Sequence, residues 1–331
     1  FKKMLNVGKS AMITANANIL FMLFLGYYTG LLLGWSTTDS FFLGSMISMS
    51  STTIIIKAFD DLNIKKQKFT DLVFGVLVIE DLVGILLLVL LPMVALGQSI
   101  NGGELALSTF KLLSFLILCF VIGIYIVPTV LKKLTSFLND EMLLLITVGM
   151  CFGMVWLATA SGFSSALGAF LMGSVLSETG LIVRIENVVR PLKDFFGAVF
   201  FVSVGMMVDP AMFVTYAGPI AVVTLIVVVG KVVFSCFGFV ISGQSLRTST
   251  ECAFSLAQVG EFAFIIAALG MSLGVLDGQV YPVIVAVSVI TTFLTPVMIR
   301  SAGPVYRLIE RKLPASWSRY INKASAARAP S

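Results

Sequence analysis

The sequence predicts an all-α polytopic membrane protein. Of its 331 residues, 58% are hydrophobic and only 12% are charged, whereas soluble domains average about 45–50% and 25%. The mean hydropathy is +1.03. Long apolar runs recur along the chain, and they approach the roughly 20 residues that a helix needs to cross a bilayer. These observations exclude a soluble protein, and the continuous runs differ from the short alternating strands of a membrane barrel.

Several segments are apolar enough to be candidate membrane spans, and we expect about ten transmembrane helices. The candidates are Ala11–Gly34, Phe41–Ala58, Leu72–Leu96, Leu107–Leu131, Met142–Ala160, Gly162–Leu176, Phe195–Val208, Val214–Ile241, Thr250–Met271 and Val280–Ile299.

Positive charges alternate between the two sides of this series. Lys and Arg residues precede the first span and follow every second one. The connections between them contain neither residue, namely 35–40, 98–104, 209–213 and 272–279. Because Lys and Arg concentrate in cytoplasmic loops, the pattern predicts that both ends of this chain are cytoplasmic.

Two adjacent carboxylates, Glu80 and Asp81, lie in the middle of the third candidate span. Each charge at mid-membrane costs roughly 2.5–3.5 kcal/mol on insertion scales. Such residues mark ion paths or proton relays, and the alternative is a structural ion pair that fixes helix packing. The two side chains point about 100° apart on a helix, so one partner does not easily neutralise both. We therefore favour a path for protons or cations past Glu80 and Asp81.

The second candidate span contains a row of hydroxyl residues that includes Ser51, Thr52 and Thr53. Hydroxyl side chains compete for backbone hydrogen bonds and loosen a helix. An interrupted helix here would expose carbonyl and hydroxyl oxygens that suit an alkali cation. The alternative is ordinary packing of small residues between membrane helices.

The ninth candidate span contains Gln258, Gly260 and Glu261 in its middle. A glycine followed by a charge at membrane depth predicts a second interrupted helix, whose ends would present partial charges to an ion. The alternative is that Glu261 reaches the interface or pairs with a loop arginine.

One cation, Lys231, lies well inside the eighth candidate span. A buried lysine pairs with a carboxylate or loses its proton, so we expect a pair with Glu80 or Asp81, and spacing alone allows either. The alternative is that the span starts later and places Lys231 at an interface.

The first three spans and the last three follow the same order. Each set has a helix, an interrupted helix and a further helix, and the span count gives the two sets opposite starting sides. The pattern predicts an inverted repeat, and an interrupted segment at the same place in each half is the best sequence indication of a transport site.

At this level of detail the chain resembles the sodium/proton-exchanger domain family of cation:proton antiporters, in its KefC-like and NapA-like branch. The resemblance rests on SSTTIIIKAFDDL, VFGVLVIEDLVGILLLVLLP, FSSALGAFLMGSVLSE, FFGAVFFVSVGMMVD and LAQVGEFAFIIAALG.

The resemblance implies an elevator-type antiporter with two crossing interrupted helices. Asp81 matches the acid that binds cation and proton in turn, and Glu80 matches the preceding acid that pairs with Lys231. Ser51, Thr52 and Thr53 fall at the first crossing segment, and Gly260 and Glu261 fall at the second. It also implies that spans preceding Phe1 are missing and that the full-length protein is a homodimer.

We therefore expect a transport domain over 1–312 and a polar, disordered cytoplasmic tail over 313–331. The expected activity is exchange of Na⁺ or K⁺ for H⁺ at Asp81, in a bacterial inner membrane. We expect neither enzymatic activity nor a cofactor, and no nucleic-acid partner. The alternatives are a gated monovalent cation channel and a KefC-like potassium efflux system.

Overall fold

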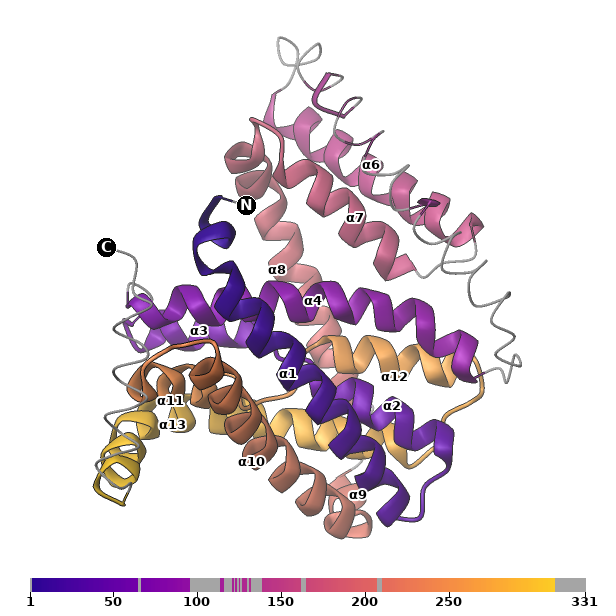
Figure 1. Cartoon of the computed structure of the whole chain (residues 1–331). Helices are drawn as coiled ribbons and strands as arrows, with labels where there is room; N and C mark the ends of the chain where they lie inside the picture. The colour runs from indigo at the N-terminus through magenta and orange to yellow at the C-terminus, as the bar shows by residue number, and fades with distance from the viewer. Residues whose placement is uncertain are drawn as a thin grey trace. The chain divides into compact units, whose positions relative to one another are not determined.

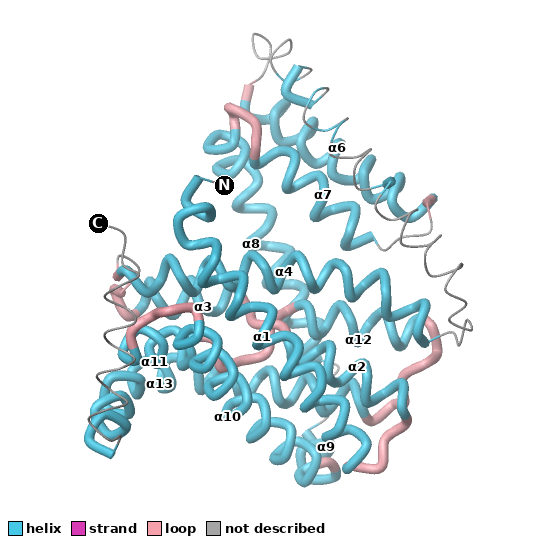
Figure 2. Tube along the Cα trace, viewed as in Figure 1, coloured by secondary structure: helices cyan, strands magenta, loops and turns pink. Residues whose placement is uncertain are grey.

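In the computed structural model, the described residues form α-helices, most of them joined by short connections (Figure 1). It describes residues 2–64, 67–95, 139–161, 165–206 and 210–312, with single residues between 114 and 131. No strand occurs among these residues, as Figure 2 shows. The predicted all-α class is therefore confirmed.

The chain forms two compact units, Phe1–Leu87 with Val208–Ser331 and Leu88–Met207. The helices of the first unit are α1 (Lys2–Leu32), α2 (Thr37–Ser48), α3 (Thr52–Asp61), most of α4 (Lys68–Ala95), α9 (Pro210–Thr215), α10 (Ala217–Ile241), α11 (Leu246–Ser255), α12 (Phe262–Ser272) and α13 (Val280–Lys312). Those of the second unit are α6 (Asp140–Ala160), α7 (Ser165–Ser177) and α8 (Ile182–Met206).

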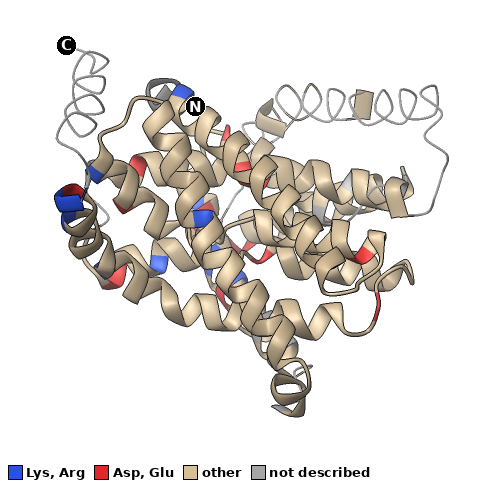
Figure 3. Ribbon diagram, turned by 60° about the horizontal axis from the view of Figure 1, so that its bottom comes forward, with Lys and Arg blue, Asp and Glu red and all other residues tan. Residues whose placement is uncertain are grey.

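Within the described residues, 6 helices are long and apolar enough to cross a membrane. These spans are Gly8–Leu32, Thr37–Asp61, Phe69–Pro92, Asp140–Ala160, Ala217–Ile241 and Val280–Lys312. Charged residues are sparse along the ribbon, and long stretches without them lie in between (Figure 3). The protein is an integral, multi-pass membrane protein.

Two sequence-based boundaries are wrong. Helix α8 begins at Ile182, well before the expected start at Phe195, because the charged segment between them folds as exposed helix rather than as a loop. Helix α9 begins at Pro210, inside the segment 209–213 that was expected to be a connection. Most of the candidate span Leu107–Leu131 and the tail 313–331 lie outside the described residues.

The first unit contains the same order of elements twice. Helix α1 is followed by the pair α2 and α3 and then by α4, and helix α10 is followed by α11 and α12 and then by α13. Helix α1 contacts both α2 and α10. Ser10 meets Ser242 and Thr14 meets Gly238, so α1 and α10 run antiparallel. This direction agrees with the inverted order that the sequence predicts.

The turn that enters each helix pair is built in the same way in both halves. Gly34 and Gly243 have φ angles of 79° and 95°, in the left-handed region where a side chain is disfavoured. Two residues later, Ser36 and Ser245 cap the amino ends of α2 and α11. Each serine oxygen accepts a backbone N–H that the helix leaves without a partner.

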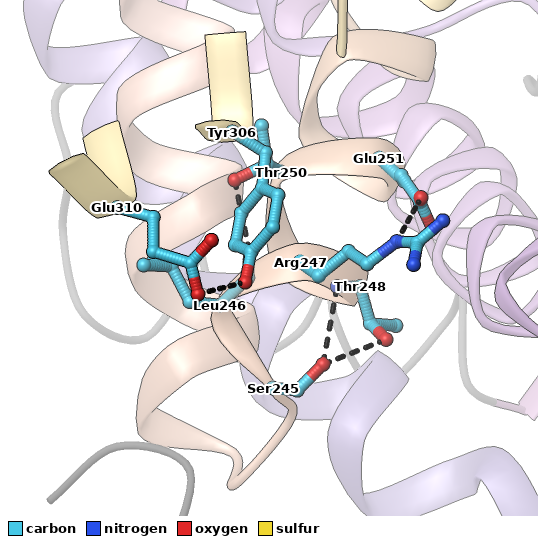
Figure 4. A network of polar contacts seen from close by, with 8 residues as sticks. All are labelled: Ser245, Leu246, Arg247, Thr248, Thr250, Glu251, Tyr306 and Glu310. Carbon is cyan, nitrogen blue, oxygen red and sulfur yellow. Dashed lines mark hydrogen bonds and ion pairs between the residues drawn. The ribbon is translucent and has the colours of Figure 1, made fainter. Parts of the chain in front are cut away.

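Figure 4 shows the amino end of α11 beside α13. Ser245 Oγ accepts from Thr248 N at 3.2 Å, and Arg247 pairs with Glu251 at 3.0 Å. Nearby, Tyr306 donates to Glu310 at 2.7 Å. An exposed ion pair such as Arg247–Glu251 contributes at most about 1 kcal/mol, so the cap and the packing on α13 fix this end of the helix.

The half-helix α2 lies in the interior of the first unit. Nine of its residues are buried, from Asp39 to Ser48 with the exception of Phe41. Gly44 lets α2 approach α1 closely, because a Cβ there would lie 2.3 Å from the carbonyl oxygen of Leu23. A helix that is enclosed in this way carries its carboxyl end into the protein core rather than to the surface.

Candidate functional site

Two breaks in helix geometry define the candidate site. Helix α2 ends at Ser48, and Met49 and Ser51 have extended backbones before α3 begins at Thr52. Helix α11 ends at Ser255, and α12 begins only at Phe262. The interrupted helices that the sequence predicts are therefore present, although Thr52 and Thr53 already belong to α3.

The two breaks are hydrogen-bonded to each other. Gly260 N donates to Met49 O at 2.9 Å, and Ser51 N donates to Gln258 Oε1 at 2.9 Å. The Gln258 amide also donates to Ser51 O at 3.2 Å. Backbone groups freed by the breaks thus find partners across the crossing, as burial in an apolar core requires.

Gly260 makes this close crossing possible. A Cβ at this position would lie 2.6 Å from both the carbonyl carbon and the oxygen of Ser50. Since real Cβ atoms do not approach backbone atoms so closely, only glycine fits without moving the two segments apart.

Asp81 lies at the edge of the crossing and is partly exposed. Its carboxylate accepts a hydrogen bond from Thr52 Oγ1 at 3.2 Å. Glu261 accepts from Ser51 Oγ and, at 3.1 Å, from Thr53 Oγ1. Glu261 is near enough to interact electrostatically with Asp81. Two carboxylates and three hydroxyls are thus gathered on one side of the crossing. All five groups can offer an oxygen ligand to a cation.

Glu80 lies on the inner side and is 0% exposed. Its Oε1 accepts from Asn18 Nδ2 at 2.8 Å, and its Oε2 accepts from Ser50 N at 2.8 Å. Successive helix residues point about 100° apart, which places Glu80 and Asp81 in different surroundings. Both carboxylate oxygens of buried Glu80 accept hydrogen bonds, whereas Asp81 is partly exposed.

Lys231 is also 0% exposed, but it makes no direct ion pair with Glu80. Its Nζ donates to Ser50 Oγ and to Gln258 O, both at 2.8 Å. The expected pair is replaced by a bridge, because the Ser50 N–H donates to Glu80 and the Ser50 hydroxyl oxygen accepts a hydrogen bond from Lys231 Nζ. The opposite charges remain near enough to interact electrostatically.

Sequence reasoning missed several members of this network. Asn18 was detectable as an amide within an otherwise apolar span, and Ser50 as part of the hydroxyl row. On α13, Thr291 Oγ1 accepts from Val259 N at 3.3 Å and so satisfies a backbone group of the second break. No local signal relates Thr291 to Val259, because tertiary packing alone brings them together.

A comparison with protein families identifies the group to which this architecture belongs. The sequence model of the family described as "Sodium/hydrogen exchanger, transmembrane" matches residues 1–302. The chain belongs to the sodium/hydrogen exchanger family. The expected family is therefore confirmed, and it is a family of transporters rather than of enzymes.

Three relatives illustrate the range within the sodium/hydrogen exchanger family. YbaL of Escherichia coli (strain K12), named as a candidate cation/proton antiporter, is 32% identical over 90% of this chain and 55% of its own length. The K(+)/H(+) antiporter subunit KhtU of Bacillus subtilis (strain 168) is 27% identical over 93% of this chain and 76% of its length. A Na(+)/H(+) antiporter of Enterococcus hirae is 26% identical over 88% of this chain and 76% of its length. The chain thus spans about half the length of the first of these relatives.

Proposed function

We propose that the protein exchanges a monovalent cation, Na⁺ or K⁺, for protons across a membrane. The observation that supports this most strongly is the pair of bonded helix breaks beside Asp81, inside an otherwise apolar bundle. Irregular backbone at membrane depth is tolerated where it lines a site. The names of KhtU and of the Enterococcus hirae relative add support, since they describe K(+)/H(+) and Na(+)/H(+) antiporters.

The cation binds at Asp81 in this proposal. Asp81 supplies a partly exposed carboxylate, and the hydroxyl of Thr52 lies 3.2 Å from it. Glu261 and its hydroxyl partners, Ser51 and Thr53, complete an oxygen-rich wall. Hard alkali cations prefer such carboxylate and hydroxyl oxygens to nitrogen or sulfur ligands.

Protons and cations compete for the same carboxylate. A protonated Asp81 has lost the negative charge that attracts the cation, and a bound cation opposes protonation. Loading one ligand therefore releases the other. A carrier that changes its access between the two sides then exchanges them, and we propose an elevator-type movement for this step.

Glu80 and Lys231 have a different role in the proposal. Both are fully buried and are joined through Ser50, so they hold the first break against α10 and keep a compensating positive charge beside the site. A gated channel would favour a continuous pore lined by rings of ligands. An asymmetric acid pair with one lysine fits a carrier better.

We also propose a location, a membrane orientation and an oligomeric state for the whole protein. We place it in a bacterial inner membrane with both ends of this chain in the cytoplasm, because Lys and Arg alternate between connections. We also propose a homodimer for the full-length protein, on the family resemblance alone.

The test is ion flux in liposomes containing the whole protein, driven by an imposed pH gradient, with Na⁺, K⁺ and Li⁺ compared. Asp81→Asn should abolish exchange. Asp71→Asn is the matched control, because Asp71 is exposed in the first turn of the same helix and should leave exchange intact. In the unmodified protein, the cation concentration for half-maximal rate should rise as pH falls.

Substantial exchange by Asp81→Asn would refute the site assignment. Flux that does not require a counter-moving proton would refute exchange itself and favour the channel.

A further inference from the structure

One face of α1 carries polar side chains toward α10. Ser10, Thr14 and Asn18 are spaced four residues apart, and such residues lie above one another on a helix. Ser10 Oγ is hydrogen-bonded to Ser242 Oγ. A Cβ on Gly238 would lie 2.8 Å from Thr14 Cα. The polar face of α1 is therefore packed against α10 and not against lipid.

Three oxygen atoms in this interface have no hydrogen-bond partner among the described residues. They are Thr14 Oγ1, Asn18 Oδ1 and Ser235 Oγ. All three residues are 0% exposed. A buried hydroxyl or amide oxygen without a partner is destabilising, so a ligand that donates or accepts hydrogen bonds is expected there.

The three residues follow one another closely along the interface. Thr14 is opposite Gly238, and Ser235 is three residues before Gly238, which is about 4.5 Å along the axis. Asn18 is about 6 Å from Thr14 in the same direction, because the two helices are antiparallel. Ser235 thus falls between Thr14 and Asn18, within one helical turn of each.

Water fits this site better than other small ligands. Internal waters typically make two to four hydrogen bonds to buried polar groups that otherwise lack partners. The unpartnered atoms here are uncharged and include both hydroxyl donors and an amide acceptor. An alkali cation would instead favour the carboxylates on the other side of the crossing.

The site adjoins Glu80 directly, because Asn18 Nδ2 donates to Glu80 Oε1 at 2.8 Å. At its other end lies a second polar cluster, where Gln244 donates to Ser10 at 3.2 Å and Ser10 meets Ser242. From Ser10 to Asn18 the axis rises about 12 Å, a length that a few water-mediated bonds of about 2.8 Å can bridge. The positive-inside pattern predicts that this end is cytoplasmic.

We propose that Thr14, Asn18 and Ser235 bind internal water beside Glu80, and that this water carries protons between Glu80 and the Ser10–Ser242 end. The inference rests on the proposed exchange activity and adds a proton path separate from the cation site at Asp81.

The transfer step involves no redox change. The O–H bond of a protonated Glu80 breaks, its electron pair stays on the carboxylate, and the proton passes to a water oxygen and along the hydrogen-bonded chain. Reprotonation reverses the step. The Asn18 amide can serve both forms, since its NH₂ group donates to the carboxylate and its carbonyl oxygen accepts from the carboxylic acid after rotation. Lys231, bridged by Ser50, is the cation that faces Glu80.

Thr224 provides a matched control on the same helix. Its hydroxyl also has no partner among the described residues, but it borders an apolar pocket lined by residues such as Phe213, Ile290 and Leu294. Thr224 therefore tests whether any unpartnered hydroxyl on α10 would behave in the same way.

The first measurement locates the water without relying on transport. Thr14→Cys, Ser235→Cys and Thr224→Cys are compared in membranes by X-ray radiolysis, which forms hydroxyl radicals from water next to each thiol. Positions 14 and 235 should be oxidised several-fold faster than position 224. Equal rates at all three positions would overturn the water site, whether or not the protein exchanges cations for protons.

The second measurement tests the proton path in liposomes. Thr14→Val and Ser235→Ala should slow exchange by about tenfold or more, since a positioned proton-transfer group commonly contributes a factor of about 100 or more. The cation concentration for half-maximal rate should stay unchanged, and Thr224→Val should match the unmodified protein. Fast oxidation combined with unchanged exchange in Thr14→Val and Ser235→Ala would show that the water is structural and would overturn the proton path. Absence of exchange in the unmodified protein would refute the proposed function instead.

Discussion

Replacing Gly260 by alanine tests how closely the two broken helices must approach. The new Cβ would lie 2.6 Å from the carbonyl carbon and oxygen of Ser50 and 3.0 Å from the nitrogen of Ser51. Ordinary contact begins near 3.4 Å, so the two segments would have to separate by about 0.8 Å. The obstructing atoms belong to the backbone and cannot rotate away as a side chain can.

The separation can be converted into an energy. The bond from Gly260 N to Met49 O, now 2.9 Å, would stretch to about 3.7 Å and leave the range of a hydrogen bond. The bond from Ser51 N to Gln258 Oε1 runs across the same gap and would weaken with it. Overpacking costs about 1–3 kcal/mol and each lost bond adds about 1 kcal/mol. We therefore expect Gly260→Ala to destabilise the protein by about 2–4 kcal/mol.

The assay is thermal unfolding of the whole protein in lipid nanodiscs, followed by liposome flux of the same preparation. Gly303→Ala is the control, because Gly303 lies in helix α13, away from the crossing, and its added Cβ meets nothing within 4 Å. Gly303→Ala should keep or slightly raise the melting temperature, since alanine favours a helix. If Gly260→Ala matched Gly303→Ala in both melting temperature and flux, the close crossing would not be needed.

Three further substitutions address the network around the breaks. Glu80→Gln should retain exchange at a rate lowered as in Thr14→Val, because it removes the proposed proton carrier, and should change the pH profile or the voltage dependence of exchange, measured in liposomes at clamped potentials; an inactive Glu80→Gln beside an active Asp81→Asn would reverse the roles of the two acids. Gln258→Leu removes two hydrogen bonds to the backbone of the first break and should lower the free energy of unfolding by about 2–3 kcal/mol, whereas Gln279→Leu at an exposed position should not. Ser245→Ala removes the cap of α11 and should cost about 0.5–2 kcal/mol; an unchanged melting temperature would show that packing on α13 fixes that end alone.

The breaks and the depth of the acids could be predicted because their signals are local. A row of hydroxyls, or a glycine beside a charge, weakens a helix wherever it occurs. The apolar run around Glu80 and Asp81 likewise indicates their depth without any knowledge of neighbours. The confirmed all-α membrane class follows from the same kind of information.

The hydrogen-bond partners could not be predicted, because residues distant in the sequence supply them. Charge alone suggested that Lys231 would meet Glu80 or Asp81, and the family resemblance favoured Glu80. The position of Ser50 between Lys231 and Glu80 depends on how α2 ends. Asn18 reaches Glu80 from α1, and no pattern in either segment relates them. The start of α8 was misplaced for a different reason, since hydropathy detects apolar faces and misses an exposed charged helix.

The charges at the crossing have a consequence for leakage. Glu80, Asp81 and Glu261 are three carboxylates, and Lys231 is the one ammonium group that we have placed beside them. When all four are ionised, the site holds more negative than positive charge, and an unbalanced charge is costly to enclose in an apolar environment. Moving the empty site across the membrane is therefore the least favourable step, whereas a site that holds a cation or a proton is closer to neutral. In the proposed exchanger, the acids that attract the ligands would thus discourage the return of an unloaded carrier, which is the condition for exchanging one ion for the other without dissipating either gradient.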